Sequence, residues 1–139
     1  MAHLSYTKGS VDNQTVYSAI TAQVLFAAAK VIPCFGAKAI ALQLVEGGTV
    51  NNRSGALSIQ VSGDGTNFTT YSMLISNTTN TNSQTLTRVA SLTRNSAGND
   101  VIFFSPESLG AITHFKAQIA FTDGAAPTGN FTLIANIQY

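Results

Sequence analysis

The chain has 139 residues, enough for one domain that folds without metal ions or disulfide bonds. Only 9% of the residues are charged, against about 25% in ordinary soluble domains, and the net charge is +1. This sparse, balanced charge excludes the basic footprint of a nucleic-acid-binding protein, and the most apolar stretch, residues 24–35, is too short to span a membrane. The N-terminus also lacks a secretory signal pattern, so we expect a soluble chain with no membrane partner.

Residues 1–17 are polar and weakly patterned, which predicts an N-terminal arm ahead of one folded domain over residues 18–139. Within the domain, eight segments show the alternation or the β-branched and aromatic content typical of strands. The first of them, residues 19–30, also contains an alanine run that suits a helix, and we predict a strand there because of its neighbours. The eight predicted strands cover residues 19–30, 39–45, 57–61, 68–76, 86–93, 101–105, 113–122 and 130–139.

The connections between these strands are rich in Gly, Asn, Ser and Thr, as turns require. Residues 62–67 read Ser-Gly-Asp-Gly-Thr-Asn and contain the Asp-Gly pair of a tight hairpin turn. A further turn is predicted at residues 106–110. Loops are predicted over residues 47–55, 77–84 and 95–100.

The clearest alternation of apolar and polar residues lies in the last quarter of the chain. It runs through residues 113–122 and again through residues 130–139, so each run predicts a half-buried strand. Residues 123–129 between them contain two glycines and a proline. We therefore predict that the two runs form an antiparallel hairpin that closes the domain.

Short strands at regular spacing, joined by turn sequences, indicate an all-β fold. We predict a single antiparallel β-sandwich or jelly-roll-like domain of about eight strands. Its core is predicted from the apolar face of each alternating segment: Ile40, Leu42, Leu44, Leu57, Ile59, Val61, Phe115, Ile119, Phe121, Phe131, Leu133 and Ile137.

The six carboxylates are spread along the chain, and no two have the spacing of a glycosidase pair. Asp64, Asp100 and Asp123 lie beside Gly or Asn, where a short acceptor side chain caps a turn. Asp64 with Asn67 is a candidate for Ca²⁺, but the stretch lacks the ligand density of a calcium loop. We predict no metal site and no cofactor.

The chain contains one cysteine and two histidines. Cys34 lies in an apolar setting and is predicted to be buried as a small hydrophobic side chain. The alternative is a reactive thiol with His114 as its base. His3 lies far away in the arm, so no metal signature arises, and no serine elbow or phosphate-binding glycine loop occurs. We expect no catalytic residues and no enzymatic activity.

The low charge admits two interpretations. In the first, an extracellular or environmental protein relies on hydroxyl and amide groups for its solubility. In the second, which we favour, much of the surface is covered in an assembly, where desolvating charged groups would be costly. The seven basic residues are dispersed, and we interpret Arg88 and Arg94 as parts of a solvated strand face.

Residues 58–71, Ser-Ile-Gln-Val-Ser-Gly-Asp-Gly-Thr-Asn-Phe-Thr-Thr-Tyr, resemble a pattern of small β-sandwich proteins from tailed bacteriophages. In that pattern a strand ends in Ser/Gly-Asp-Gly-Thr-Asn-Trp/Phe and returns through Thr and an apolar residue. This turn, the polar arm and the closing hairpin are similar to capsid decoration (cement) proteins, and the turn also resembles modules of phage tails and adhesion devices. Here Phe68 stands where the pattern usually has Trp.

The resemblance implies a structural protein of the virion, which decorates and stabilises a phage capsid through many weak contacts. Its partners would be the major capsid protein and further copies of the chain, as a homotrimer, on a capsid surface assembled in the host cytoplasm. The alternative is a tail or adhesion module that binds host glycans through aromatic rings. The candidate rings are Tyr6, Tyr17, Phe68 and Tyr71.

Overall fold

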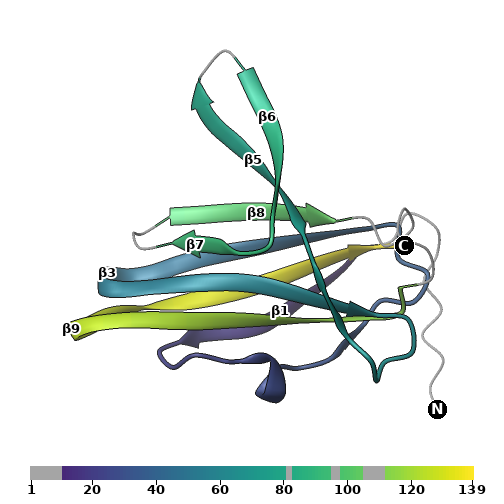
Figure 1. The fold of residues 1–139 in the computed structure, drawn as a ribbon, viewed down its shortest axis with the longest axis horizontal. Coiled ribbons are helices and arrows are strands. Elements are labelled where there is room, and N and C mark those ends of the chain that lie inside the picture. The colour runs from purple at the N-terminus through teal and green to yellow at the C-terminus, as the bar shows by residue number, and fades with distance from the viewer. Residues whose placement is uncertain (1–10, 81–82, 95–97, 105–111) are drawn as a thin grey trace.

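The computed structural model describes residues 11–80, 83–94, 98–104 and 112–139, and most of them lie in antiparallel strands (Figure 1). The all-β antiparallel fold predicted from the sequence is confirmed. No helix in the described ranges is long and apolar enough to cross a membrane. The elements are β1 (Val11–Ile20), the 3₁₀ helix η1 (Phe26–Ala28), β2 (Ile32–Pro33), β3 (Ala39–Ser62), β4 (Thr69–Tyr71), β5 (Met73–Asn80), β6 (Ser83–Val89), β7 (Leu92–Arg94), β8 (Gly98–Phe104) and β9 (His114–Gln138).

Two long strands, β3 and β9, form the centre of the sheet, and both bend back at the same end of the molecule (Figure 1). Residues 39–47 of β3 pair with residues 130–138 of β9. Residues 53–62 of β3 pair with residues 114–123 of β9. The bends therefore divide one hydrogen-bonded sheet into two layers.

The shorter strands extend these two layers. Layer 1 contains residues 39–47 and 130–138 with β1 at one edge and β8, β5 and β6 on the other side. Layer 2 contains residues 53–62 and 114–123 with β2, β4 and β7. The β5–β6 hairpin projects away from the body of the protein beyond β8 (Figure 1).

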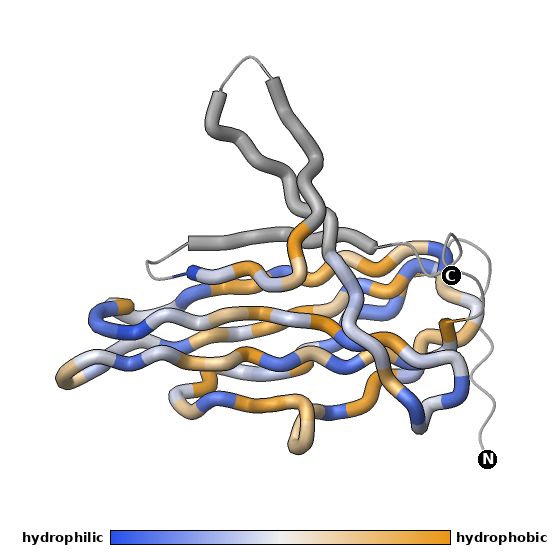
Figure 2. The backbone as a smooth tube through the Cα atoms, viewed as in Figure 1, coloured by the Kyte–Doolittle hydropathy of each residue, from blue (hydrophilic) through white to orange (hydrophobic). Residues whose placement is uncertain are grey.

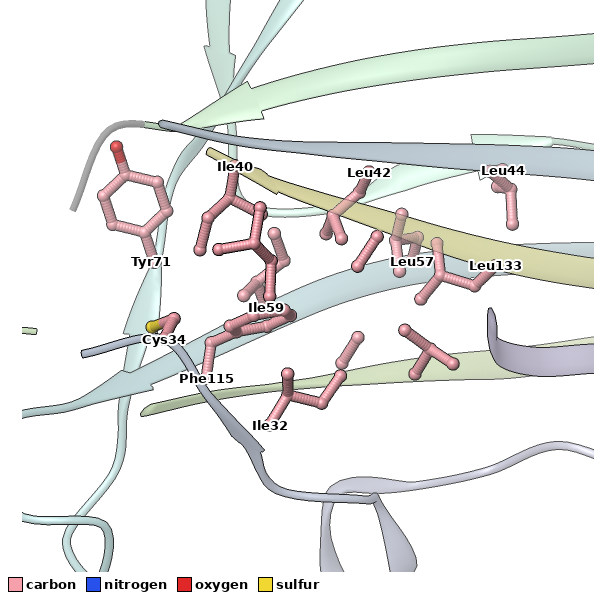
Figure 3. Close-up of a cluster of buried hydrophobic side chains, with 14 of the residues drawn as sticks. Ile32, Cys34, Ile40, Leu42, Leu44, Leu57, Ile59, Tyr71, Phe115 and Leu133 are labelled. Carbon is pink, nitrogen blue, oxygen red and sulfur yellow. The ribbon is translucent and has the colours of Figure 1, made fainter. Parts of the chain in front are cut away.

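The buried core draws its side chains from both layers (Figure 3). Along the paired arms of β3 and β9 every second side chain is buried, and hydropathy alternates in step along the chain (Figure 2). All predicted core residues are buried except Phe121, which is partly buried and packs against the cluster. The cluster also contains residues that were not predicted to lie in the core, Val16, Ile32, Ala37 and Tyr71.

The predicted C-terminal hairpin is wrong in its pairing. Residues 130–138 are already paired on both sides, by β1 and by β3. Residues 114–119 are paired by β3 on one side and by β2 and Val24 on the other. The two halves of β9 therefore belong to different layers instead of lying side by side. Both runs are nevertheless strand, with the predicted faces buried.

The N-terminal arm predicted over residues 1–17 is wrong from residue 11 onward, because β1 pairs with β9. Most side chains of β1 are polar, and only Val16 is buried. Backbone hydrogen bonds to β9 hold this strand in the sheet, and its apolar contacts with the core come from Val16, Tyr17 and Ile20. Residues 1–10 lie outside the described ranges.

The strand predicted over residues 19–30 is also wrong. Ala19 has a positive φ of 46°, and β1 ends one residue later. The chain then makes a single bridge between Val24 and Ile119 and forms η1 over part of the alanine run. The left-handed conformation of Ala19 and the end of β1 at Ile20 prevent a long regular strand here.

The loop predicted over residues 47–55 is a bend inside β3. The ladder with β9 shifts register there, and Gly48 and Asn52 adopt positive φ angles of 67° and 53°. On the β9 side, Ala126 and Gly129 adopt φ angles of 47° and 104°. Left-handed residues in both strands let the two chains turn together without breaking the sheet.

The predicted polar loops over residues 77–84 and 95–100 are wrong where they are described, because β5 runs to Asn80, β6 begins at Ser83 and β8 begins at Gly98. The single strand predicted over residues 86–93 is divided between β6 and β7. The predicted turn at residues 106–110 lies outside the described ranges.

An ion pair connects the bend of β3 to the bend of β9. Arg53 in β3 donates from Nε and Nη2 to the carboxylate of Asp123 in β9 at 2.9 and 3.0 Å, and from Nη1 to the carbonyl of Gly129 at 2.9 Å. Its guanidinium also lies 4.6 Å from the ring centroid of Phe121. The hydrogen bonds from Arg53 lower the pKa of Asp123. This contact connects the bent ends of both long strands.

Candidate functional site

The predicted Asp-Gly turn at residues 62–67 is confirmed as a hairpin between β3 and β4, at the end of β3 away from the bends. Ser62 Oγ accepts the backbone N–H groups of Asp64 and Gly65 at 3.2 and 2.9 Å. The carboxylate of Asp64 accepts the backbone N–H groups of Thr66 and Asn67 and the side-chain amide of Asn67, each at 2.8 Å. The turn is therefore held by its own side chains.

These hydrogen bonds hold the pKa of the exposed Asp64 carboxyl well below its ordinary value, first through the backbone N–H groups of Asn67 and Thr66. The turn-capping role predicted for Asp64 is confirmed. Within the ranges that the structure describes, no group of three or more His, Cys, Asp and Glu side chains could hold a metal ion.

We expect Asp64→Asn to lower the melting temperature at pH 7, because an amide cannot accept all the hydrogen bonds that the carboxylate accepts. A pKa that is lower in the folded state stabilises the protein fully above the unfolded pKa of about 4, and the effect is lost as the pH falls toward the folded pKa. Thermal melts from pH 7 to pH 2 should therefore show the difference from wild type shrinking below pH 4. Asp12→Asn serves as a control outside the turn, and a difference independent of pH would contradict the prediction.

A pocket of about 390 Å³ opens beside this turn, between β3, β4 and the residues that lead into β9. Its apolar wall consists of Val61, Tyr71 and Ile112. Hydroxyl and amide side chains form much of the remainder: Ser62, Asn67, Thr69 and Thr70. Among the described residues, none that lines the pocket carries a formal charge.

The strand pairing fixes the pocket wall. Thr69 and Tyr71 lie two residues apart and share one face of β4. They lie directly opposite Val61 and Ile59 of β3 in the ladder. Figure 3 shows the Tyr71 ring at one end of the core cluster. The pocket wall is therefore a continuation of the core.

The residues that lead into β9 support the turn from the other side. The backbone N–H of Thr113 donates to the carbonyl of Ser62 at 2.9 Å, and Thr113 Oγ1 lies 2.7 Å from Nδ1 of His114. Gly65 has a φ of +78°, and a Cβ there would lie 2.9 Å from Cε1 of His114. The glycine of the Asp-Gly pair is thus required by its backbone conformation and by the close approach of the imidazole.

Cys34 is buried, as predicted. Burial raises the pKa of its thiol to about 12. The sulfur therefore stays neutral at pH 7 and lacks the thiolate character of a nucleophile. This burial contradicts the alternative in which Cys34 and His114 form a reactive pair.

The candidate aromatic rings do not form an exposed platform in the described ranges. Tyr71 is buried, and the hydroxyl of the partly buried Tyr17 donates to the carbonyl of Ala117 at 2.6 Å. Phe68 is partly buried, with Nζ of Lys116 lying 4.4 Å from its ring centroid. Tyr6 lies outside the described ranges.

Arg94 is not a purely solvated residue. Its Nε lies 3.4 Å from Oε1 of Glu46, whose side chain has no exposed surface, and the Arg94 side chain itself is 35% exposed. The pair connects β7 in layer 2 to β3 in layer 1. The side chains of Arg88 and Asp100, and all of His3, lie outside the described part of the chain.

No protein-family model matches the chain, and no curated protein matches it. Among solved structures, the chain is similar to one titled "Crystal structure of SPBc2 prophage-derived protein YomS", with a TM-score of 0.63 and 9% sequence identity. The match covers 99% of this chain and 100% of that chain. At such low identity the likeness shows a shared fold over the whole length.

Proposed function

We propose that the chain is a non-enzymatic structural protein of a bacteriophage particle, which decorates and stabilises the capsid through contacts with the major capsid protein. The observation that carries the proposal is the full-length likeness of its fold to a prophage-derived protein. The resemblance of residues 58–71 to phage β-sandwich proteins points to the same class.

The outer face of layer 1 supports a role in assembly. In the three neighbouring strands β1, β9 and β3, the side chains that alternate with the inward-facing ones point outward. They carry aliphatic, hydroxyl or amide groups and no charge: Asn13, Thr15, Ala39, Ala41, Gln43, Val45, Thr132, Ile134 and Asn136. A partner can cover such a face without paying the desolvation cost of buried charges.

A homotrimer on the capsid surface would multiply these contacts. Closed cyclic symmetry is general among homo-oligomers, and a repeated lattice converts modest affinities into high avidity. The number three follows from the resemblance to decoration proteins.

A glycan-binding tail or adhesion module remains the alternative function. A platform of exposed aromatic rings for this function has little support. The Tyr17 hydroxyl is hydrogen-bonded within the fold, Tyr71 is buried, and Lys116 lies over the ring of Phe68.

Cryo-electron microscopy of the phage particle that carries this chain tests the proposal. We expect density for the fold, including its projecting β5–β6 hairpin, at regular positions on the capsid shell, with three copies around each local axis. Density confined to the tail or its fibres would reject the capsid assignment. A chain absent from purified particles would reject the structural role altogether.

Deletion of residues 1–10 tests whether the N-terminal segment contributes to attachment. We expect the shortened chain to keep its melting temperature and to be lost from particles in sedimentation, because a segment that orders on a neighbour adds contact area on binding. The deletion must stop before Val11, since removing β1 would damage the sheet itself. Full retention on particles would reject a role for the segment.

A further inference from the structure

We propose that the pocket beside the Ser62–Asn67 turn binds a neutral saccharide unit. The proposal goes beyond the structural role, and it holds or fails independently of where the chain sits on a particle. Its basis is the uncharged mixture of apolar and hydroxyl or amide groups that line the pocket.

The first argument is charge. The described residues that line the pocket offer hydroxyl, amide and backbone groups but no ionised side chain. The nearest acidic group in the sequence, Asp64, directs its carboxylate to the N–H groups of Thr66 and Asn67. A phosphate, carboxylate or ammonium ligand would therefore lose its hydration without gaining an ionic partner. A neutral ligand avoids this loss.

The second argument is the composition of the pocket wall. Val61, Ile112 and Tyr71 contribute apolar groups, and Thr69 and Asn67 contribute hydrogen-bonding groups. A sugar ring has the matching construction, with C–H groups on its faces and hydroxyl groups around its edge. Small-molecule sites commonly combine an apolar lining with a few placed polar groups in this way.

The third argument is size and rigidity. At about 390 Å³ the pocket is near the lower end of the range of small-molecule sites, roughly 300–1,000 Å³, which suits one or two sugar rings. The part of its wall formed by β3, β4 and their turn is fixed before binding by the β3–β4 ladder and by the hydrogen bonds of Ser62 and Asp64. Little ordering entropy is then lost when a ligand binds.

Nuclear magnetic resonance titration of the intact chain is the test. The probes are glucose, galactose, mannose and N-acetylglucosamine with their disaccharides, beside sialic acid, glucose 1-phosphate and a Ser/Thr/Gly tetrapeptide. We expect at least one neutral sugar, at millimolar concentration, to shift the amide resonances of residues 61–71 and Ile112. The charged sugars should bind more weakly.

The matched variants are Thr69→Val, which removes a hydroxyl from the pocket, and Thr15→Val, which makes the same change on the exposed β1 strand. We expect Thr69→Val to weaken binding about five- to tenfold, as the loss of one neutral hydrogen bond does, and Thr15→Val to leave it unchanged. Amide spectra establish that both variants are folded.

Three results would overturn the proposal. One is the absence of shifts with every neutral sugar. Another is a response confined to residues outside the pocket or equal in both variants. The third is binding of the charged sugars or of the tetrapeptide in place of the neutral sugars.

Discussion

Phe131→Ala should lower the free energy of unfolding by about 3–5 kcal/mol, because it removes a fully buried ring from between the layers. The ring comes from β9 in layer 1 and packs against Gly55 of β3 in layer 2, where a Cβ would lie only 2.7 Å from its Cζ atom. Its centroid also lies 5.2 Å from that of Phe121. For a domain of this size, the melting temperature should fall by about 10–20 °C.

Phe35→Ala is the matched control, because that ring is 76% exposed and its loss should change stability by less than about 0.5 kcal/mol. Urea denaturation followed by circular dichroism measures both variants. Equal losses of stability in the two variants would show that the layers are not held together by the ring of Phe131.

A double-mutant cycle tests the contact with Gly55 directly. Gly55→Ala should cost about 1–3 kcal/mol, because the added methyl group must displace a rigid ring in a filled core. The cost should be smaller in a Phe131→Leu background, where the ring is gone, so the two changes should not be additive. Additive losses would mean that the added methyl group is accommodated without moving Phe131.

The alternating segments could be assigned as strands from the sequence because alternation is a local property. The alternation correctly predicted which side chains of both halves of β3 and β9 face inward, and those side chains are buried apart from the partly buried Phe121. Alternation does not identify the neighbouring strand. Residues 113–122 and 130–139 are adjacent in the sequence and joined by a glycine-containing segment, so a hairpin was the simplest expectation. Their actual partner, β3, lies far earlier in the sequence, with pairs that range from Ser62 and His114 to Ala39 and Gln138.

The bend of β3 corresponds to a change in the apolar pattern of the sequence, which can be interpreted once the structure is known. The buried positions change from even to odd numbers between the two halves, because the bend contains residues that shift the register with β9. The even set is Ile40, Leu42, Leu44 and Glu46, and the odd set is Gly55, Leu57, Ile59 and Val61. A loop and a bend within a strand would give the same change of parity, so the sequence alone could not distinguish them.

The sequence patterns that could have predicted β1 and the pocket are weaker than the alternation in β3 and β9. In β1 the side chains are mostly polar, since the strand lies at an edge and is held by backbone hydrogen bonds that no residue pattern reports. The turn at residues 62–67 was recognisable from its Asp-Gly pair. The pocket beside it was not, because its wall also needs Ile112, which the fold brings from 45 residues beyond Asn67.

Arg94→Met should lower the free energy of unfolding by about 2–4 kcal/mol, because the variant weakens the compensation of a buried carboxylate. Glu46 points toward the core from β3, and its side chain has no exposed surface. The expected loss is below the full cost of isolating a buried charge, since Arg94 is itself 35% exposed. Lys30→Met, which removes an exposed cation, should change stability by less than about 0.5 kcal/mol.

Combining Arg94→Met with Glu46→Gln separates the charge from the packing. Gln has nearly the shape of Glu but no charge, so the double variant should recover part of the stability that Arg94→Met loses. Denaturation curves of the two single variants and the double variant give the coupling energy between the side chains. If Arg94→Met is no more harmful than Lys30→Met, or if Glu46→Gln adds its own loss in full, the ion pair does not hold β7 to β3 in layer 1. A positive coupling energy would show that this contact between the layers depends on charge, in contrast to the apolar contact of Phe131 with Gly55.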